Sequence, residues 1–280
     1  TRRLAFIKFL IFCNMKRQVV LIGMGVMGKR HKERLLKKGF EIVQELDSYE
    51  SVASFFQGNE NGFLKRKILF IASPANTHFE YVKRGFLKGF DVFIEKPVAL
   101  NVTEVEELEQ LAIQQKRILF PGHSEHYHAG FSVLEKAFND FKEGKISFFR
   151  HNTYSKRGRD VSVALDLMVH DLEMFFALTK SKDYEILFCR VFSDDAIELE
   201  ICCGAWVGYF SVDRNARTLR REILLEKGLK QEKIFFADCH EFDALEKEHE
   251  VFFSKEYDDL KEEMFSAKLA VEIASKMVSA

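Results

Sequence analysis

The sequence lacks an excess of either charge, with 42 Lys and Arg residues against 43 Asp and Glu residues. Bulk charge therefore gives no reason to expect a nucleic acid or an anionic membrane as partner. The chain also lacks internal repeats and low-complexity tracts. Hydrophobic residues make up 47% of it, which is enough for a packed core and far from a disordered composition. Its 280 residues are typical of two domains of ordinary size.

Cysteine is scarce, and its spacing lacks the pattern of a metal site. The five cysteines are Cys13, Cys189, Cys202, Cys203 and Cys239. An odd number without metal-ligand spacing is typical of reduced thiols in a cytoplasmic protein. We therefore expect a cytoplasmic location and no bound metal.

The N-terminal residues Thr1–Asn14 are basic and then apolar, as in a secretory signal. They lack a small-residue cleavage site, and Lys8 interrupts an apolar run too short to span a bilayer. A strand-turn-helix unit begins almost at once, at Gln18. We expect Met15 to be the natural start, residues 1–14 to be an extension, and the protein not to be exported.

From Gln18 to about Gly122 the chain alternates apolar strand patterns with amphipathic helix patterns, which predicts a parallel, doubly wound sheet. A capping box, Thr103-x-x-Glu106, is expected to begin the last of these helices, which runs to Gln115. The expected strands are Val19–Ile22, Phe40–Leu46, Lys67–Ala72, Phe90–Ile94 and Arg117–Phe120. The other expected helices are Val26–Lys38, Tyr49–Phe56 and Thr77–Lys88, and a loop is expected over Gly58–Gly62.

After His123 strand patterns follow one another with little helix between them, which predicts a mostly antiparallel sheet. The expected strands are Lys145–Thr153, Tyr184–Phe192, Ala196–Cys202, Ala205–Asp213, Arg221–Glu226 and Gln231–Phe236, the last two paired across Lys227-Gly228. The expected helices are Phe131–Phe141, Ser162–Thr179 and one from about Tyr257. The predicted fold is α/β: an N-terminal Rossmann domain over 15–122 and a C-terminal α+β domain with an open sheet over 123–280.

A glycine fingerprint, Gly23-Met-Gly25-Val26-Met27-Gly28, follows the first strand and opens the first helix. Gly23 permits the tight turn, Gly25 lets the backbone approach a pyrophosphate, and Gly28 lets helix and strand pack closely. The helix N-terminus supplies free N–H groups to the phosphates. Although a plain glycine turn is the alternative, this context favours dinucleotide binding.

An acidic residue near the end of the second strand is expected to bind the adenosine ribose. Asp47, at the end of the strand, is the better placed candidate. For Glu45 the alternative is a solvated strand residue with no role in binding. A carboxylate there favours NAD, because it repels the 2′-phosphate of NADP. Ser48 and nearby lysines leave NADP possible.

Two further strand ends carry polar residues, and parallel strand ends are where open α/β sheets bind ligands. Glu95-Lys96-Pro97 ends the fourth strand, so Lys96 is delivered to the site by a rigid element, although a charged turn is the alternative. The third strand ends in a run that contains the cofactor-binding candidates Ser73, Pro74, Asn76 and His78. For Asn76 and Thr77, helix capping is an equal alternative.

A second chemical cluster lies in the expected helix Ser162–Thr179. Asp166 and His170 are four residues apart and share a face, with Glu173 one turn further on. Their neighbours are apolar, so the helix is expected to be buried, and a carboxylate beside an imidazole suits a base held in orientation. The alternative is a buried histidine with one hydrogen bond.

Together the fingerprint, Glu95-Lys96-Pro97 and Asp166-x-x-x-His170 resemble the Gfo/Idh/MocA family of NAD(P)-dependent sugar and cyclitol oxidoreductases, over Met15 to the C-terminus. The resemblance implies that Lys96 touches the nicotinamide and the reacting hydroxyl. It implies that Asp166 and His170 are the other catalytic groups, with His170 as base and Asp166 orienting it. It also suggests a homodimer or homotetramer formed through the C-terminal sheet.

Two stretches, 122–127 and 159–171, are similar to the nucleotide-sugar branch of the family, which includes UDP-N-acetylglucosamine 3-dehydrogenases. The branch implies a UDP-linked amino sugar as substrate. His126 and His128 depart from it, because an Arg and an Asn are common there, and the second domain is short. A free sugar or inositol dehydrogenase, and a non-catalytic NAD(P)-binding regulator, are the alternatives.

Substrate-binding candidates lie near both clusters. His123 follows the fifth strand and is expected to face the same site. Lys156, Arg157 and Arg159 precede the catalytic helix and are suited to a substrate pyrophosphate or carboxylate. A solvated basic loop is the alternative.

Overall fold

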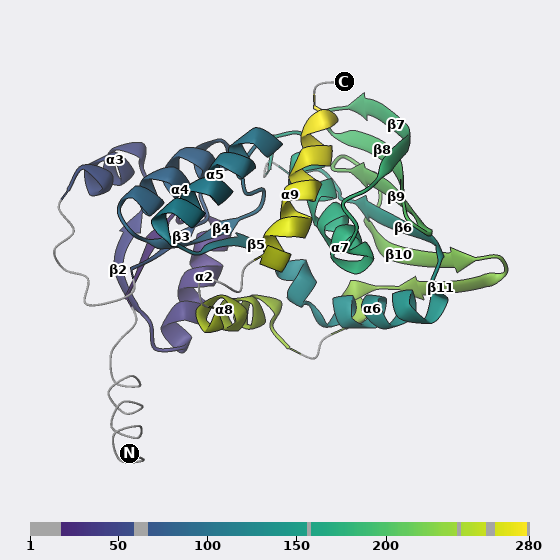
Figure 1. Cartoon of the computed structure of the whole chain (residues 1–280), viewed down its shortest axis with the longest axis horizontal. Helices are drawn as coiled ribbons and strands as arrows, with labels where there is room; N and C mark the ends of the chain where they lie inside the picture. Colours follow the sequence, from purple (N-terminus) through teal and green to yellow (C-terminus); the bar gives the residue numbers. More distant parts are fainter. Residues whose placement is uncertain (1–17, 59–66, 156–157, 240–241, 256–260, 279–280) are drawn as a thin grey trace, which may run out of the picture.

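The computed structural model describes residues 18–58, 67–155, 158–239, 242–255 and 261–278. The predicted extension Thr1–Asn14 and most of the predicted loop Gly58–Gly62 lie outside them. Two sheets lie side by side, and the C-terminal helix α9 (Lys261–Lys276) runs between them (Figure 1). No helix in the described ranges is both long and apolar enough to span a bilayer.

The first sheet is entirely parallel, with strand order β2-β1-β3-β4-β5. This confirms the predicted doubly wound sheet. The strand order reverses between β1 and β3, and ligands of such sheets bind beyond the carboxyl ends of the strands at that point. The strands are β1 (Gln18–Ile22), β2 (Glu41–Leu46), β3 (Ile68–Ile71), β4 (Asp91–Glu95) and β5 (Leu119–Gly122).

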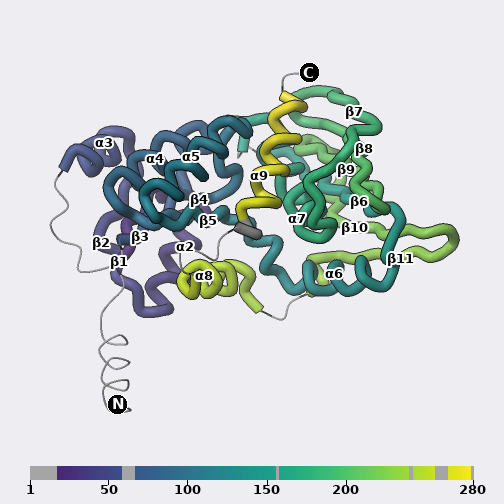
Figure 2. The backbone as a smooth tube through the Cα atoms, in the orientation of Figure 1, coloured from purple at the N-terminus to yellow at the C-terminus, as the bar shows by residue number. Residues whose placement is uncertain are grey.

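Helices cover both faces of this sheet, because successive strand side chains point to opposite sides. Val20 and Leu69 belong to the core under α3, α4 and α5, whereas Val19 and Phe70 pack on the side of α2 and α8 (Figure 2). The helices are α2 (Val26–Lys37), α3 (Tyr49–Gln57), α4 (His78–Leu87), α5 (Val102–Gln115) and α8 (Ala244–Ser254).

Helix α8 has no counterpart in the sequence prediction. Phe252 is fully buried against Phe70, Phe93 and Phe120, with ring centroids 5.5 to 5.7 Å apart. Although α8 falls in the range 123–280 that we predicted as the second domain, it packs on the first sheet. Ion pairs also join it and its N-cap to α2: Arg34–Asp243, Lys37–Glu246 and Lys38–Glu250.

The predicted cap of α5 is wrong by two residues. Asn101, not Thr103, is the N-cap, and its Oδ1 accepts a hydrogen bond from the Glu104 N–H at 3.0 Å. Glu104 in turn accepts from the Leu100 N–H at 3.0 Å. Asn and Thr are both good caps, so the Thr-x-x-Glu pattern is ambiguous by itself.

The second sheet has the order β11-β10-β6-β9-β8-β7, in which β6 and β9 pair in parallel and the other neighbours are antiparallel. The mostly antiparallel sheet is confirmed, as is the hairpin across Lys227-Gly228. The strands are β6 (Gly144–His151), β7 (Glu185–Ser193), β8 (Ala196–Cys203), β9 (Trp206–Asp213), β10 (Arg220–Lys227) and β11 (Lys230–Ile234).

Helices α6 (Ala129–Phe141) and α7 (Val169–Thr179) pack on this sheet, α6 against β10 and β11 and α7 against β9. Helix α9 packs against α7 and also reaches α5 and β5 of the first half, so it ties the two halves together (Figure 1). Strand β7 lies at the sheet edge, and every one of its residues is exposed. Short helical turns complete the fold: η1 (Ala75–Thr77), η2 (Ser124–Tyr127), η3 (Ala164–Met168) and η4 (Phe236–Asp238).

Candidate active site

The glycine fingerprint forms a tight turn against the end of β3. Gly23 has a φ of +89°, and a Cβ there would lie 2.5 Å from the backbone of Ala72. A Cβ on Gly28 would lie 1.8 Å from the Gly23 carbonyl oxygen, so both positions require glycine. A Cβ on Gly25 would meet nothing within 4 Å. The open side of the turn is therefore at Gly25, where a pyrophosphate would approach the backbone, and the turn fits a dinucleotide.

Asp47 stands at the end of β2 beside this turn. Its Oδ1 accepts a hydrogen bond from the Met24 N–H at 2.6 Å. Glu45, one residue inside the strand end, pairs instead with Lys32 at 2.6 Å. The carboxylate at the strand end is thus the one held against the fingerprint, as a ribose-binding residue must be.

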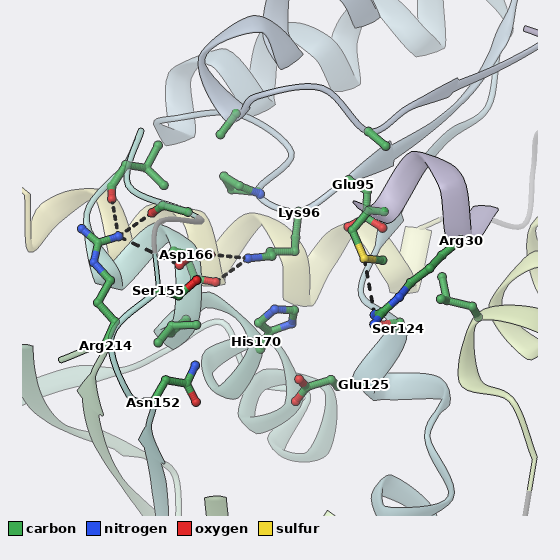
Figure 3. A pocket seen from close by; sticks show the side chains of 18 of the residues that line it. Arg30, Glu95, Lys96, Ser124, Glu125, Asn152, Ser155, Asp166, His170 and Arg214 are labelled. Carbon is green, nitrogen blue, oxygen red and sulfur yellow. Dashed lines mark hydrogen bonds and ion pairs between the residues drawn. The ribbon is translucent and has the colours of Figure 1, made fainter. Parts of the chain in front are cut away.

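A cavity of about 670 Å³ lies between the two halves, beyond the carboxyl ends of β3 and β4 (Figure 3). The structure brings together there seven of the predicted residues: Met27, Ser73, Pro74, Glu95, Lys96, Asp166 and His170. The far wall comes from the second half, and includes Asn152, Arg214 and Arg221.

Lys96 points across the cavity to the second half of the chain (Figure 3). Its Nζ donates to Asp166 Oδ1 at 2.8 Å and to the Asp166 main-chain oxygen at 2.5 Å. The main-chain contact follows from local structure, because residues 164–168 form a π-helical turn, η3, rather than α-helix. Such turns interrupt the regular bonding of a helix and are frequent at functional sites.

The prediction that Asp166 orients His170 is wrong in this structure. We inferred it from α-helical spacing, but the π-helical turn changes the spacing around Asp166. Asp166 pairs with Lys96, and no hydrogen bond joins it to His170 among the described residues. Asp166 therefore positions the lysine instead.

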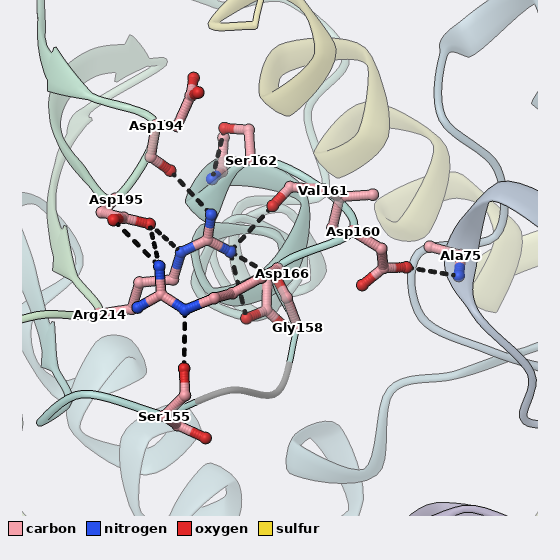
Figure 4. A network of polar contacts seen from close by, with 12 residues as sticks. Ala75, Ser155, Gly158, Asp160, Val161, Ser162, Asp166, Asp194, Asp195 and Arg214 are labelled. Atoms are coloured by element: carbon pink, nitrogen blue, oxygen red, sulfur yellow. Dashed lines mark hydrogen bonds and ion pairs between the residues drawn. The ribbon is translucent and has the colours of Figure 1, made fainter.

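Asp166 is itself enclosed by the loop before η3 (Figure 4). Gly158 has a φ of +67°, and a Cβ there would lie 2.2 Å from Asp166 Oδ2. Arg214 holds this loop, because its Nη1 donates to the carbonyl oxygens of Gly158 at 2.5 Å and Val161 at 2.8 Å. Its Nε donates to Asp195 at 2.5 Å. The loop is thereby fixed on the Asp166 carboxylate.

His170 lines the cavity, and its Nδ1 is buried without a hydrogen-bond partner in the described part of the chain (Figure 3). The pKa of His170 lies well below its usual value. Burial is the main cause, the positive charges of Lys96 and Arg150 lower the pKa further, and the negative charge of Glu125 partly opposes them. The ring is therefore neutral at physiological pH and can accept a proton.

A buried ion network beside His170 was missed by sequence analysis. Arg150 of β6 bonds Glu125 at 2.6 Å and Asp171 at 2.5 Å, and Arg221 also contacts Glu125. Burial raises the pKa of Glu125, but Arg150, His170 and Arg221 outweigh it and hold that pKa well below its usual range. Arg150 lies within the predicted strand Lys145–Thr153, and a buried arginine needs a carboxylate partner. Its presence in that strand could have indicated such a network.

A second buried network lies under Glu95. The Glu95 carboxylate contacts His31 Nε2 of α2 at 2.7 Å, and His31 Nδ1 lies 2.8 Å from His249 Nε2 of α8. Burial lowers the pKa of His249 to about 2, so its ring is neutral. A neutral His249 has a single N–H, and its Nε2 can donate to or accept from His31 Nδ1 according to its tautomer, while His31 Nε2 is placed to donate to Glu95. Helix α8 thus helps to hold a cavity residue.

Several predicted residues lie away from the cavity. Asn76 is exposed and does not line it. His78 is buried and bonds the carbonyl oxygens of Pro97 at 2.7 Å and Ser73 at 2.9 Å, so it joins two strand ends instead of facing a ligand. Thr77 Oγ1 donates to the Pro74 carbonyl oxygen at 2.7 Å.

Of the predicted substrate residues, His123 and Arg159 are described, and neither lines the cavity. His123 is buried, with its ring perpendicular to that of His170 at a centroid distance of 6.2 Å. Arg159 pairs with Asp195 at 3.2 Å and with Asn215 at 2.7 Å. Lys156 and Arg157 lie outside the described residues. In the ranges that the structure describes, no three His, Cys, Asp or Glu side chains are arranged to hold a metal ion.

Residues 17–123 match the model of the GFO_IDH_MocA family, described as an oxidoreductase family with an NAD-binding Rossmann fold. The first sheet and helices α2, α3, α4 and α5 therefore resemble the Gfo/Idh/MocA family. This part of the chain is therefore an NAD(P)-binding Rossmann domain, and its glycine turn has the shape that a dinucleotide requires.

Known relatives resemble parts of this chain. UDP-N-acetylglucosamine 3-dehydrogenase of Acidithiobacillus ferrooxidans is 28% identical over 117 residues, or 41% of this chain and 37% of that protein. Inositol 2-dehydrogenase of Rhizobium meliloti is 23% identical over 175 residues, or 55% of this chain and 52% of that protein. The matched segments thus span no more than about half of these curated relatives.

The likeness in fold extends further. The solved structure of the Acidithiobacillus ferrooxidans dehydrogenase has a TM-score of 0.76 to this chain at 19% identity. It covers 94% of this chain and 97% of that one. Both halves of the molecule therefore share the fold of that structure.

Proposed function

We propose that the protein is an NAD(P)-dependent oxidoreductase that oxidises a secondary hydroxyl of a sugar. The observation that carries this proposal is the meeting of Lys96 and His170 in one cavity, at the carboxyl edge of a sheet whose glycine turn fits a dinucleotide. A cationic donor and a neutral base on one cavity are the groups that alcohol oxidation requires.

The chemistry divides between these groups. When bound, the nicotinamide supplies the acceptor for the hydride from the alcohol carbon. His170 takes the hydroxyl proton at the ring nitrogen that faces the cavity, since Nδ1 is buried. Lys96 donates a hydrogen bond to the same oxygen and stabilises the negative charge that develops on it. Asp166 keeps the Lys96 ammonium in place.

For the cofactor we propose NAD as the preferred form. Asp47 puts a carboxylate next to the fingerprint, where it can bond the ribose hydroxyls and would repel a 2′-phosphate. Replacing Asp47 with Ser should remove that repulsion. Titrating NADH and NADPH by fluorescence should show a smaller preference for NADH in Asp47→Ser than in the parent chain, and an unchanged preference would contradict the proposal.

For the substrate we propose a UDP-linked amino sugar such as UDP-N-acetylglucosamine. The support is the relative from Acidithiobacillus ferrooxidans, together with two arginines at the cavity wall, Arg30 and Arg221, which are suited to phosphate groups. A free sugar or inositol is the second candidate, favoured by the match to inositol 2-dehydrogenase.

One experiment separates these substrates. The protein is incubated with NAD⁺ or NADP⁺ and UDP-N-acetylglucosamine, UDP-glucose, inositol or glucose, and reduced cofactor is followed by its absorbance. Lys96→Ala should abolish turnover while NADH binding persists. Lys83→Ala is the matched control, because Lys83 pairs with Glu107 on the surface. Activity in Lys96→Ala would reject the site, and activity confined to free sugars would reject the nucleotide-sugar substrate.

We also propose a homodimer or homotetramer formed through the second sheet. The support is strand β7, whose exposed side chains include Ile186, Leu187, Phe188, Val191 and Phe192. Long exposed apolar edge strands are otherwise sites of unwanted association. Light scattering after gel filtration measures the mass, and a monomer at micromolar concentration would contradict the proposal.

A further inference from the structure

Several buried polar atoms without a partner lie near one another around His123, His170 and Glu173. Seven buried side-chain nitrogen and oxygen atoms lack a hydrogen-bond partner among the described residues. They belong to five residues: His123, His170, Glu173, Glu248 and His249. Buried polar groups are nearly always bonded, and a cluster of unbonded ones is the usual sign of internal water.

The cluster begins at His170. Its Nδ1 is one of the unpartnered atoms, and the ring of His123 stands perpendicular to it at a centroid distance of 6.2 Å. Both nitrogens of His123 are buried and unpartnered, and no direct hydrogen bond joins the two rings. A water molecule needs two to four polar partners, and His170 Nδ1 with one His123 nitrogen supplies two of them. The other His123 nitrogen points away from the first and is free to bond a second water.

The cluster continues to a residue that reaches the surface. Glu173 of α7 bonds His126 Nδ1 at 2.9 Å and accepts from Ser266 Oγ at 2.8 Å, both through Oε1. Its Oε2 is buried and unpartnered. The His126 side chain is 31% exposed, whereas that of Glu173 is 3% exposed. Glu173 therefore connects the buried atoms to solvent through His126.

We propose that His123, Glu173 and His126, which we call the buried polar tract, carry the substrate proton from His170 to solvent through internal water. The inference rests on the proposed function, because that function makes His170 the base. The cavity side of His170 is occupied by substrate during reaction, so the opposite nitrogen is the exit that remains open.

The proton balance is complete. The hydroxyl O–H bond breaks, its proton joins the cavity-facing nitrogen of His170, and its electron pair becomes part of the new C=O bond as the carbon loses hydride to NAD(P)⁺. The proton already on Nδ1 passes by water and His123 to Glu173 and then to His126, which releases it. After product leaves, the neutral ring of His170 turns so that its remaining proton faces the tract again and an unprotonated nitrogen faces the cavity. One proton has then passed through the tract to solvent in each turnover.

The charges around the tract favour this direction. Burial lowers the pKa of His170 and of His123, so neither ring retains an added proton. Burial opposes ionisation of Glu173, but His126, His123 and Ser266 outweigh it and lower its pKa, so it is an anion able to receive the proton. The groups that face His123 are Glu173 and His170 of α7, His126 of η2, and Glu95 and Lys96 at the end of β4. Glu248 of α8 faces Glu95 and Glu173.

Kinetic isotope effects test the tract, with the full-length protein, NAD⁺ and the sugar that proves to be its substrate. Glu173→Gln keeps the shape but cannot accept the proton, and His123→Phe keeps an aromatic ring without nitrogens. Turnover in both should fall about tenfold or more, in the range typical of lost proton transfer. Ser266→Ala is the matched control, because it removes a neighbour of Glu173 and leaves the carboxylate.

The isotope pattern distinguishes transport from structure. In Glu173→Gln the solvent deuterium isotope effect on kcat should rise, because proton release has become slow. The primary isotope effect, measured with substrate that carries deuterium on the carbon that loses hydride, should fall towards one for the same reason. Ser266→Ala should keep the parental pattern. A merely structural defect would slow hydride transfer and leave the carbon effect at or above its parental size, which would overturn the proposal, as would unchanged turnover.

A crystal structure tests the tract independently of activity. At a resolution that shows ordered water, we expect water bonded to His170 Nδ1, to a His123 nitrogen and to Glu173 Oε2. A dry, closed gap between these atoms would overturn the tract. Absence of NAD(P)-linked turnover would instead overturn the proposed function, and the crystallographic result would still decide whether the water exists.

Discussion

Lys96 Nζ donates both to the carboxylate and to the main-chain oxygen of Asp166, at 2.8 Å and 2.5 Å. The lysine comes from the end of β4 in the first half, and the aspartate from the π-helical turn in the second half. One pair of contacts therefore orients the reacting ammonium and joins the two walls of the cavity.

Replacing Gly158 with Ala should reduce turnover through Asp166. The new Cβ would lie 2.2 Å from Asp166 Oδ2, so the carboxylate that holds Lys96 must move. Gly228→Ala is the matched control, because Gly228 also has a positive φ, +59°, and its Cβ would meet nothing within 4 Å. Both variants should lose about 1–2 kcal/mol in the free energy of unfolding because of the positive φ, and Gly158→Ala should lose more because of the clash with Asp166. Steady-state kinetics should show the loss of kcat in Gly158→Ala alone, and equal kcat values would contradict the role of the loop.

Replacing Glu125 with Gln should shift the pH profile of kcat/KM. The Glu125 charge opposes the fall of the His170 pKa, so its removal should lower that pKa further. A base acts when deprotonated, so the acid limb should move to lower pH, while the plateau rate falls because the base is weaker. Glu222→Gln, which changes a carboxylate paired with Arg220 on β10, should leave the acid limb in place. An acid limb that moves to higher pH in Glu125→Gln would refute the assignment.

His249 should make the protein sensitive to acid. Its pKa is about 2 in the folded protein and 6.5 when unfolded, so the unfolded chain binds the proton first as pH falls. Each pH unit below about 6.5 should then cost about 1.4 kcal/mol in the free energy of unfolding, continuing towards pH 2. His249→Leu should lack this loss, whereas Phe253→Leu on the same helix should retain it. Urea unfolding at several pH values measures both, and parallel curves for His249→Leu and the parent would count against a neutral His249.

Glu248 should have the opposite effect. Burial raises its pKa well above the usual 4.5, helped by the charges of Glu95 and Glu173, so the folded protein keeps it protonated. The contribution of Glu248 to the free energy of unfolding is therefore highest below pH 4.5, where Glu248 is protonated in both states. It falls as pH rises towards the folded pKa, because the unfolded chain loses the proton first. Glu248→Gln should therefore be more stable than the parent at neutral pH, by a margin that grows with pH. Urea unfolding measures the difference in stability between Glu248→Gln and the parent at pH 5 and at pH 8. If this difference favours the variant less at pH 8 than at pH 5, Glu248 is ionised in the folded state and the prediction is wrong.

Local sequence patterns predicted most of the fold and only part of the site. Alternating strand and helix periods over Gln18–Gly122 suffice for a parallel sheet, and the fingerprint and Lys96 follow from their places at strand ends. The partner of Asp166 did not follow, because spacing along one helix cannot reveal a π-helical turn or a lysine 70 residues away.

Long-range polar partners were the other gap. In the sequence, Arg150 looks like an ordinary residue of a strand. Its partners could not be predicted, because Glu125 belongs to a turn and Asp171 to a helix elsewhere in the chain. Helix α8 was missed because its sequence, ALEKEHEVFFS, follows a strand-rich region and buries Glu248 and His249 where an apolar pattern is expected. Buried titratable groups break the hydrophobic period on which such predictions depend.

The return of α8 to the first sheet has a consequence for recombining this protein with its relatives. A chimera joined near residue 122 would exchange α8 together with the second sheet, and so replace the cover of Phe70, Phe93 and Phe120 with a foreign helix. The ion pairs of Arg34, Lys37 and Lys38 would lose their partners as well. Transfer of substrate specificity between relatives therefore calls for two crossover points, one on each side of 243–254, so that α8 travels with the nucleotide-binding half.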